Sequence, residues 1–304
     1  MIKITIIAII LISILIVLNC YTLIFDEQNI YNIKNNTGDL GVDIINAPEK
    51  KSSIIFTDLK FGDSFDDNSI FEETGKMKES ESLYWWVNSG AFFIQNKGVG
   101  MTLVGELEKG SKWQIEYKDY NSDETDNGFH PQNIFRLLTR SEWLNFNQEV
   151  YYKIVNYNLS KDSHRSESNG ILLFNRYLDE DNLYYTGLRV DGTAVIKKKI
   201  NGKYFTMDQK LIIDSSYDIN KNPNLLPISE WIGVRSEVSD FDNNQVSIKV
   251  YYRFAQDIEW KLALEAIDDG KSYGGEAIIK SGYAGIRTDF MDVEFDNYKI
   301  EESI

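Results

Sequence analysis

Three carboxylates alternate with two apolar residues near the end of the chain, in the stretch Asp292-Val293-Glu294-Phe295-Asp296. Successive side chains of a strand point to opposite faces, so this spacing predicts the carboxylates on one face and the apolar pair on the other. Paired carboxylates can hydrolyse glycosidic bonds, and several carboxylates can ligate calcium. The same row is also typical of a strand with one wet face. We expect Val293 and Phe295 to seal the core, and the carboxylates to face water or calcium.

Arginines interrupt strand-like apolar runs at three places. An arginine in the middle of a strand needs an anionic partner, which is either a carboxylate of the protein or one of a ligand. Because the chain is acidic, pairing with its own Asp and Glu residues is the simpler interpretation. The three are Arg136 in PQNIFRLLTR, Arg176 in LLFNRY and Arg189 in YYTGLRV. Tyr185 falls on the same strand face as Arg189, and both stay candidates for ligand binding.

Adjacent aromatic pairs and a run of lysines add further candidates. One member of an aromatic pair in a strand points away from the core, and such rings pack on the C–H faces of sugars. Trp86, beside Trp85, is our candidate of this kind. We expect the run Lys197–Lys199 to be a solvated edge strand protected against aggregation. Contact with an anionic glycan is the alternative, although alternate lysines point to opposite faces.

The composition excludes several classes of function. The net charge of −15 argues against nucleic acid as a partner and against docking on anionic lipid, since both need a basic surface. The single cysteine, Cys20, permits no internal disulfide. With only two histidines, His130 and His164, and no Cys/His cluster, a zinc site is not expected. The 18 Tyr, 16 Phe and 6 Trp suit half-buried sheets and sugar stacking.

The N-terminus predicts export of the rest of the chain. Residues Ile4–Phe25 carry no charge, and as a helix of about 33 Å they would cross a bilayer. Lys3 precedes this segment and acidic residues follow it, which favours an uncleaved anchor with the main domain outside, at the cell surface. A cleaved signal peptide and a lipoprotein modified at Cys20 are the alternatives. All three interpretations export the main domain.

The rest of the chain divides into a tether and one large domain. Residues 26–52 are polar and rich in Asn, without periodicity, as in a linker. From residue 53 to 304, short runs rich in Val, Ile, Tyr, Phe and Trp alternate with Gly/Asn/Asp clusters, which is typical of an all-β sandwich. Asn201-Gly202 is a hairpin turn between two such runs, and Asp191-Gly192 is a turn of the same kind. We expect some fourteen strands, KWQIEYKDY (112–120) among them, and no long helix after the membrane segment.

Three stretches resemble the concanavalin A-like lectin/glucanase superfamily. The opening FGDSFDD followed by YWWVNSGAFFIQNKGV is similar to its first strands. The stretch NGILLFNRYLDEDNLYYTGLRVDGTAVIKK looks like its ligand-face strands, and SGYAGIRTDFMDVEFDNYKI looks like its closing strand pair. The resemblance covers residues 53–300 and implies a two-sheet antiparallel jelly-roll sandwich. It says much less about activity, because function sits in sites grafted on the fold.

The resemblance also implies possible sites. Many of these sandwiches hold a structural calcium that joins the first strands to the last, and Asp63, Asp66 and Asp67 with Asp296 would supply such ligands; solvated turns are the alternative. Family 16 glucanases carry Glu where this row has Asp, and here the end residues stand about 13 Å apart along a strand. Polysaccharide lyases of this fold neutralise a uronate with Arg, Gln or Asn and take the proton with His or Tyr. The catalytic candidates for that chemistry are Arg136, Tyr185, Arg189 and His130.

The prediction is therefore an exported, membrane-anchored sandwich that binds extracellular carbohydrate. The ligand contacts would come from Arg136, Arg176, Tyr185, Arg189 and Trp86, with a structural Ca2+ at Asp63, Asp66 and Asp296. A polysaccharide lyase or glycoside hydrolase of the same fold is one alternative. A surface adhesion module that contacts protein is another.

Overall fold

A computed structural model describes residues 54–57, 59–242 and 244–303. The segment Ile4–Phe25, expected to cross the membrane, and the tether 26–52 lie outside the described residues. Within the described ranges, no helix combines the length and the apolar character that crossing a bilayer requires.

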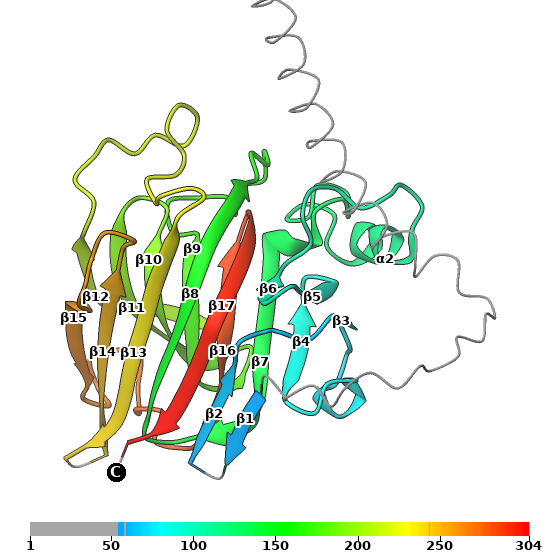
Figure 1. Cartoon of the computed structure of the whole chain (residues 1–304). Coiled ribbons are helices and arrows are strands. Elements are labelled where there is room, and N and C mark those ends of the chain that lie inside the picture. The colour runs from blue at the N-terminus through cyan, green and yellow to red at the C-terminus, as the bar shows by residue number, and fades with distance from the viewer. Residues whose placement is uncertain (1–53, 58, 243, 304) are drawn as a thin grey trace, which may run out of the picture. The chain divides into compact units, whose positions relative to one another are not determined.

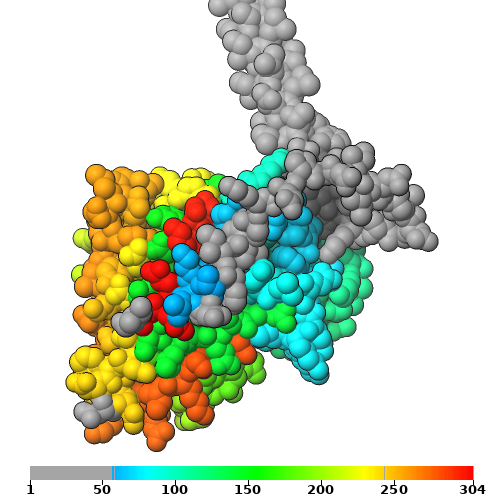
Figure 2. All heavy atoms as spheres, turned by 60° about the horizontal axis from the view of Figure 1, so that its bottom comes forward, coloured from blue at the N-terminus to red at the C-terminus, as the bar shows by residue number. Residues whose placement is uncertain are grey.

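Two antiparallel sheets overlie one another in the described part of the chain (Figure 1). Sheet A contains β1 (Ile54–Thr57), β2 (Lys60–Asp63), β3 (Ser69–Glu72), β5 (Phe92–Asn96), β6 (Val99–Met101), β8 (Phe146–Tyr157), β13 (Trp231–Phe241), β14 (Gln245–Arg253), β15 (Lys261–Asp268) and β17 (Met291–Glu302). Its order is β15-β14-β13-β8-β17-β6-β5-β3, and the hairpin β1–β2 joins it through β17. In Figure 2 this hairpin, in blue, lies against β17, in red.

Sheet B contains β4 (Trp85–Ser89), β7 (Ile134–Trp143), β9 (Gly170–Asp179), β10 (Asn182–Arg189), β11 (Thr193–Ile200), β12 (Lys203–Leu211) and β16 (Gly282–Asp289). Its order is β12-β11-β10-β9-β16-β7-β4. Short helical turns η1 (Met77–Glu79) and η2 (Pro131–Asn133) and the helix α2 (Lys112–Tyr120) complete the elements. The all-β, two-sheet antiparallel prediction is confirmed.

The hairpin turns are where the sequence places them. Asn201 and Gly202 link β11 to β12, with Ile200 paired to Lys203. Both turn residues have positive φ, 49° and 76°, which Asn and Gly tolerate better than other residues. The turn at Asp191-Gly192 likewise links β10 to β11.

Helix α2 corrects one strand prediction. Trp113, Ile115 and Tyr117 alternate with polar residues, which is the pattern of a strand. The segment instead forms a helix that buries Trp113, Gln114 and Tyr117, at positions i, i+1 and i+4, and leaves Ile115 49% exposed. The Tyr117 hydroxyl contacts Glu73 and accepts a hydrogen bond from Gly90 N at 2.7 Å. Contacts from distant parts of the chain therefore select the helix.

The closing strand β17 follows the predicted alternation for its apolar residues. Val293 and Phe295 are fully buried between the sheets, as expected. Asp292 corrects the expectation of three wet carboxylates, because it is 5% exposed and accepts hydrogen bonds from Gln132 Nε2 at 2.8 Å and Gly105 N at 3.0 Å. Burial raises the pKa of this carboxyl group. Glu294 pairs with Lys153 on the outer side of the sheet.

The lysine run corrects another expectation. Strand β11 lies between β10 and β12, so it is not at an edge. Lys198 is fully buried in the sandwich, 2.8 Å from Asp268 Oδ2, and it donates to the carbonyls of Gly275 and Glu276 at 3.0 and 2.7 Å. Asp268 also accepts from the Tyr184 hydroxyl at 2.6 Å. The buried charge thus has a full set of partners, as burial of an ammonium group requires.

We predict that Phe295→Ala destabilises the protein by about 3–5 kcal/mol, because it leaves a cavity in a closely packed core. The Phe295 ring lies 5.5 Å from that of Phe135 and 5.8 Å from that of Tyr152. Denaturant unfolding of the two proteins measures the difference. Phe241→Ala is the control, since Phe241 is 49% exposed and its loss should cost less than about 1 kcal/mol. Equal costs at both positions would contradict this packing.

Candidate functional site

The outer face of sheet B, which points away from sheet A, carries its own apolar and aromatic cluster. This cluster is separate from the core between the sheets. Its members are Leu138, Leu172, Phe174, Tyr177, Leu183, Tyr185 and Val195, with the partly buried Trp86 and Tyr283 packed against them. A sheet face that turns away from the core usually carries polar side chains. The seven members of this cluster are at most 6% exposed, and the partly exposed rings of Trp86 and Tyr283 make the face a candidate binding surface.

Two glycines form part of the floor of this outer face. Gly285 in β16 lies between Phe174 and Leu138 of the neighbouring strands, and Gly187 in β10 pairs with Leu172. Their φ angles are 155° and 150°, and a Cβ at either would lie within 2.3 Å of a carbonyl oxygen of the next strand. Only glycine fits here, because the neighbouring strand approaches closely, and both glycines are themselves buried.

Cationic side chains rise from the same face. Arg287 in β16 donates from Nε to Asp289 Oδ1 at 2.9 Å, and its guanidinium carbon lies 5.1 Å from the centre of the Tyr185 ring. Arg136 in β7 is the direct cross-strand partner of Arg287, so both side chains leave the sheet on this side. Two arginines thus lie next to each other, and the Asp289 carboxylate is bound to Arg287.

Arg189 and Lys197 extend the cationic group toward β10 and β11. Arg189 is 7% exposed; it pairs with Asp191 at 2.9 Å and donates to the Glu167 carbonyl at 3.0 Å. Lys197 lies opposite Tyr185, with its Nζ 5.9 Å from the ring centre. Burial and the positive charges of Arg189 and Arg287 lower the pKa of Lys197. The structure thus brings Arg136, Tyr185, Arg189 and Trp86, all selected from the sequence, onto one face.

Tyr185 is poorly suited to take a proton. It is 5% exposed, and burial raises the pKa of its phenol far above the ordinary value, although Arg287 and Arg189 act in the opposite direction. The neutral phenol is therefore the form present near pH 7, where a general base would need a pKa close to 7.

Arg176 corrects a ligand prediction. Its side chain is fully buried and points away from the outer face. It pairs with Asp240 at 2.9 Å and donates to the carbonyls of Leu144 and Ile278 at 2.9 and 2.8 Å. Its φ is +46°, next to a register shift between β9 and β10, so the strand does not keep its regular alternation there. Arg176 thus joins loops to the sandwich and is not accessible to a ligand.

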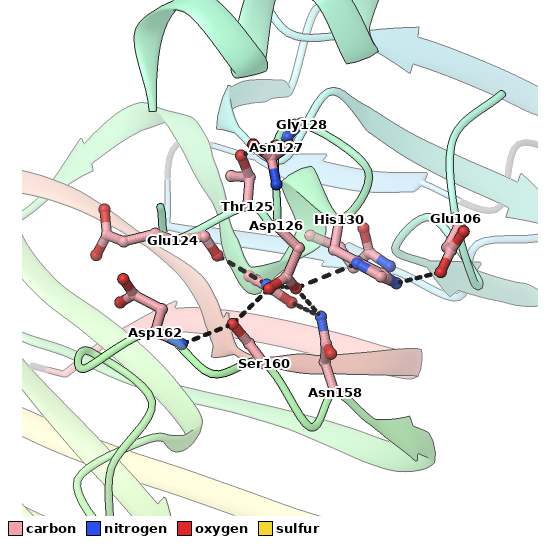
Figure 3. A network of polar contacts seen from close by, with 12 residues as sticks. Glu106, Glu124, Thr125, Asp126, Asn127, Gly128, His130, Asn158, Ser160 and Asp162 are labelled. Carbon is pink, nitrogen blue, oxygen red and sulfur yellow. Dashed lines mark hydrogen bonds and ion pairs between the residues drawn. The ribbon is translucent and has the colours of Figure 1, made fainter. Parts of the chain in front are cut away.

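His130 belongs to a different group of residues, shown in Figure 3. Its Nδ1 lies 3.2 Å from Asp126 Oδ2, and its Nε2 lies 3.9 Å from Glu106. Among the described residues, no hydrogen bond or ion pair links it to Arg136, Tyr185 or Arg189. The catalytic set inferred from the sequence is therefore not assembled by these contacts.

Asp126 is the centre of that network. Its carboxylate accepts hydrogen bonds from Ser160 at 2.6 Å, Asn158 at 2.9 Å and Asn133 at 3.2 Å. Asp126, Asn127 and Gly128 all have positive φ, between 52° and 81°, a conformation that Asp, Asn and Gly tolerate. The network fastens the loop after α2 to the end of β8, which is a structural role (Figure 3).

The calcium ligands predicted from the sequence are only partly available. Asp63 is 2% exposed and accepts hydrogen bonds from Trp85 Nε1 at 2.8 Å, Gln95 Nε2 at 3.2 Å and Phe65 N at 2.8 Å, so it is a buried structural acceptor. Within the described ranges, no three His, Cys, Asp or Glu side chains gather as a metal site. Asp296 and Asp66 are neighbours: burial, aided by the Asp66 charge, raises the pKa of Asp296.

A cavity of about 430 Å³ lies on the opposite side of the sandwich, against the outer face of sheet A. It is lined by residues of β2, β8, β13 and β17, among them Glu149, Arg235 and Glu237. Its charged groups are largely satisfied within the protein, because Arg235 is bound by Glu149 and Glu237 accepts from the Tyr251 hydroxyl at 3.0 Å. This cavity therefore ranks behind the outer face of sheet B as a site.

Arg287 and Asp289 of the outer face are not among the residues predicted from the sequence, although they lie in the stretch that resembles a closing strand pair. The signal was available, because Tyr283, Gly285, Arg287 and Asp289 recur with a period of two, opposite to the apolar Ala284 and Ile286.

Comparison with known proteins identifies no family. No family model and no curated protein matches the chain. Solved structures resemble it only at low identity and with TM-scores below 0.5.

Three of these structures illustrate the level of likeness. The carbohydrate binding module CBM66 from Bacillus subtilis is 11% identical, with a TM-score of 0.44 over 72% of this chain and 95% of that one. The GH43 protein BlXynB from Bacillus licheniformis is 12% identical, with a TM-score of 0.42 over 80% of this chain and 39% of that one. The exoplasmic/lumenal domain of VIP36, in its Ca2+/Man-bound form, is 11% identical, with a TM-score of 0.40 over 77% and 90%. At this level, none of them carries an argument about what this chain binds.

We predict that Asp126→Ala lowers the free energy of unfolding by about 2–4 kcal/mol, because three buried or half-buried donors lose a charged acceptor. Thermal or denaturant unfolding measures the change. Asp123→Ala is the matched control in the same loop, since the Asp123 side chain is exposed. A loss no larger than that of the control would show that the network does not hold the loop.

Proposed function

We propose that the chain is a carbohydrate-binding sandwich whose binding surface is the outer face of sheet B. The observation that supports this is the combination on one face of aromatic rings and charged hydrogen-bonding groups. Rings of Trp86, Tyr283 and Tyr204 offer surfaces for the C–H faces of sugars. Arginine, lysine and carboxylate groups offer directional hydrogen bonds to hydroxyl or acidic groups. Ligand sites commonly join apolar walls with a few such polar groups.

Binding is favoured over catalysis by the placement of the proton-transfer groups. His130 is engaged with Asp126 and Glu106, and Tyr185 stays a neutral phenol at ordinary pH. A lyase or hydrolase of extracellular polysaccharide remains the second candidate, because Arg136 and Arg189 share the face with a tyrosine. An adhesion module that contacts protein would use a flat apolar patch, whereas this face carries several arginines and Lys197.

The location is proposed from the sequence alone. A charge-free segment at Ile4–Phe25 followed by a polar tether would hold the sandwich outside the cell, on the membrane surface. In that position the sandwich would meet extracellular glycan. Protease treatment of intact cells tests this, because an exported sandwich is cleaved from outside and a cytoplasmic one is protected.

We predict that Trp86→Ala weakens glycan binding by about tenfold or more, since a stacked ring and its buried area are lost. The Trp86 Nε1 donates to the Thr74 carbonyl at 3.0 Å, which fixes the ring. Retention of the protein on immobilised polysaccharides, neutral and acidic, measures binding. Trp231→Ala on sheet A is the matched control and should bind normally. A Trp86→Ala protein that binds as well as the control would contradict the proposed surface.

Calcium enters the proposal only through Asp66 and Asp296, whose mutual repulsion a cation would relieve. We predict that about 10 mM Ca2+ raises Tm by about 2–4 °C, as expected for a millimolar site. Asp296→Asn should remove this rise, and Mg2+ should not replace Ca2+. An unchanged Tm in calcium would mean that these carboxylates do not bind the ion.

A further inference from the structure

The outer face of sheet B carries the cations Arg136, Arg189, Lys197 and Arg287. Asp191 pairs with Arg189 and Asp289 with Arg287, whereas Arg136 and Lys197 have no ion-pair partner among the described residues. We propose that the missing anions come from the ligand, and that this face binds an acidic glycan through Arg136 and Lys197. This inference rests on the proposed function and adds the chemical class of the sugar.

Arg136 is the first cation without a partner. Among the described residues, its side chain makes no hydrogen bond and no ion pair. Its cross-strand neighbour is Arg287, a like charge at a spacing where opposite charges stabilise a sheet. Asp289 is already bound to Arg287 Nε. A guanidinium kept next to another one, with its fork of donors unused, fits a carboxylate or a sulfate of a ligand.

Lys197 is the second cation of this face without a hydrogen bond or an ion pair among the described residues. Within the described part of the chain, its ammonium group has no hydrogen bond or ion pair, and its contact is with the ring of Tyr185. The charged groups around it are Arg189 and Arg287, which repel it, and Glu167 and Asp191, which attract it. Asp191 is already paired with Arg189 at 2.9 Å. An acidic group of a ligand would therefore meet a half-buried ammonium with little competition.

Other cations of the protein show that this arrangement is not general. The chain has 47 acidic and 32 basic residues, so intramolecular partners are plentiful. Arg235 is bound to Glu149, Lys153 to Glu294, and the buried Arg176 to Asp240. Among the described arginines, Arg136 is the one whose side chain has neither a hydrogen bond nor an ion pair. Lysines without an ion pair, in contrast, also lie on other faces.

The positions of the two cations set a minimum length for the ligand. Lys197 lies in β11 and Arg136 in β7, which are four strands apart in the order β11-β10-β9-β16-β7. With neighbouring strands about 4.8 Å apart, the backbones of the two residues are separated by about 19 Å across the sheet. A ligand that contacts both cations therefore runs across the strands, which favours an oligosaccharide over a single sugar.

The experiment compares ligands that differ only in charge. The full chain, held in detergent, is titrated with polygalacturonate and its methyl ester, and with dextran sulfate and dextran. A single-stranded oligonucleotide serves as an unrelated polyanion. We expect one acidic polymer of either type to bind at least about tenfold tighter than its neutral counterpart, with affinity falling between about 50 and 300 mM NaCl. Uronate and sulfate are distinguished by which acidic polymer binds.

The variants are Arg136→Met and Lys197→Met, with Arg253→Met and Lys249→Met on sheet A as matched controls. Each face variant should lose about tenfold in affinity for the acidic polymer, and each control should lose none. Because neither face cation has a hydrogen bond or an ion pair to lose in the described part of the chain, and each stands near a like charge, Tm of the face variants should stay equal or rise. A structural role for these residues would instead lower Tm. Monosaccharides should fail to compete, whereas fragments of the bound polymer should compete once they are long enough to span both cations.

The outcomes separate the inference from the proposed function. Equal binding of acidic and neutral polymers, lost in Trp86→Ala and kept in the face variants, would overturn the inference and leave carbohydrate binding intact. Binding of the oligonucleotide as tightly as the acidic glycan would also overturn it, since the face would then select charge alone. Absence of binding to every polymer would overturn both.

Discussion

The two-residue period of the strands in sheet B is the constraint on which both faces of that sheet depend. It sends Lys198 into the sandwich, where Asp268 and two carbonyls satisfy it, and turns Lys197 outward, where it has the ring of Tyr185 and two arginines for neighbours. A slip by one residue would exchange these roles and bury an unpaired charge. The buried pair therefore fixes the register that presents the outer face.

The same register separates structural arginines from accessible ones. Arg176 pairs with Asp240 and donates to carbonyls of two loops. Arg189 pairs with Asp191 and donates to the carbonyl of Glu167. Arg136, beside Arg287, has no such partner among the described residues, and its strand packs tightly against β16 at Gly285. Proteins often give up stability to hold a binding surface ready, and adjacent cations on a half-buried face are a recognisable form of that cost.

Sequence patterns predict much of this fold and part of the site. The alternation of Val293 and Phe295, the turn at Asn201-Gly202 and the all-β texture are local features, so they survive in the structure. The helix α2 could not be predicted, because its burial depends on contacts with Glu73 and Gly90, which are distant in sequence. The ligand role predicted for Arg176 is wrong for a related reason, because an irregularity of strand β9 turns its side chain inward. Residue type shows which side chains could bind an anion. Only the folded structure shows which of these cations are already paired within the protein and which remain able to bind a ligand.

A crystal structure of the protein with a bound acidic oligosaccharide would show which face the ligand occupies. We expect the sugar to cross β7, β16, β9, β10 and β11 on the outer face of sheet B. Its rings should contact Trp86 or Tyr283, and its acidic groups should lie within hydrogen-bond distance of Arg136 and Lys197. An oligosaccharide found instead in the cavity between β2, β8, β13 and β17 on sheet A would contradict it.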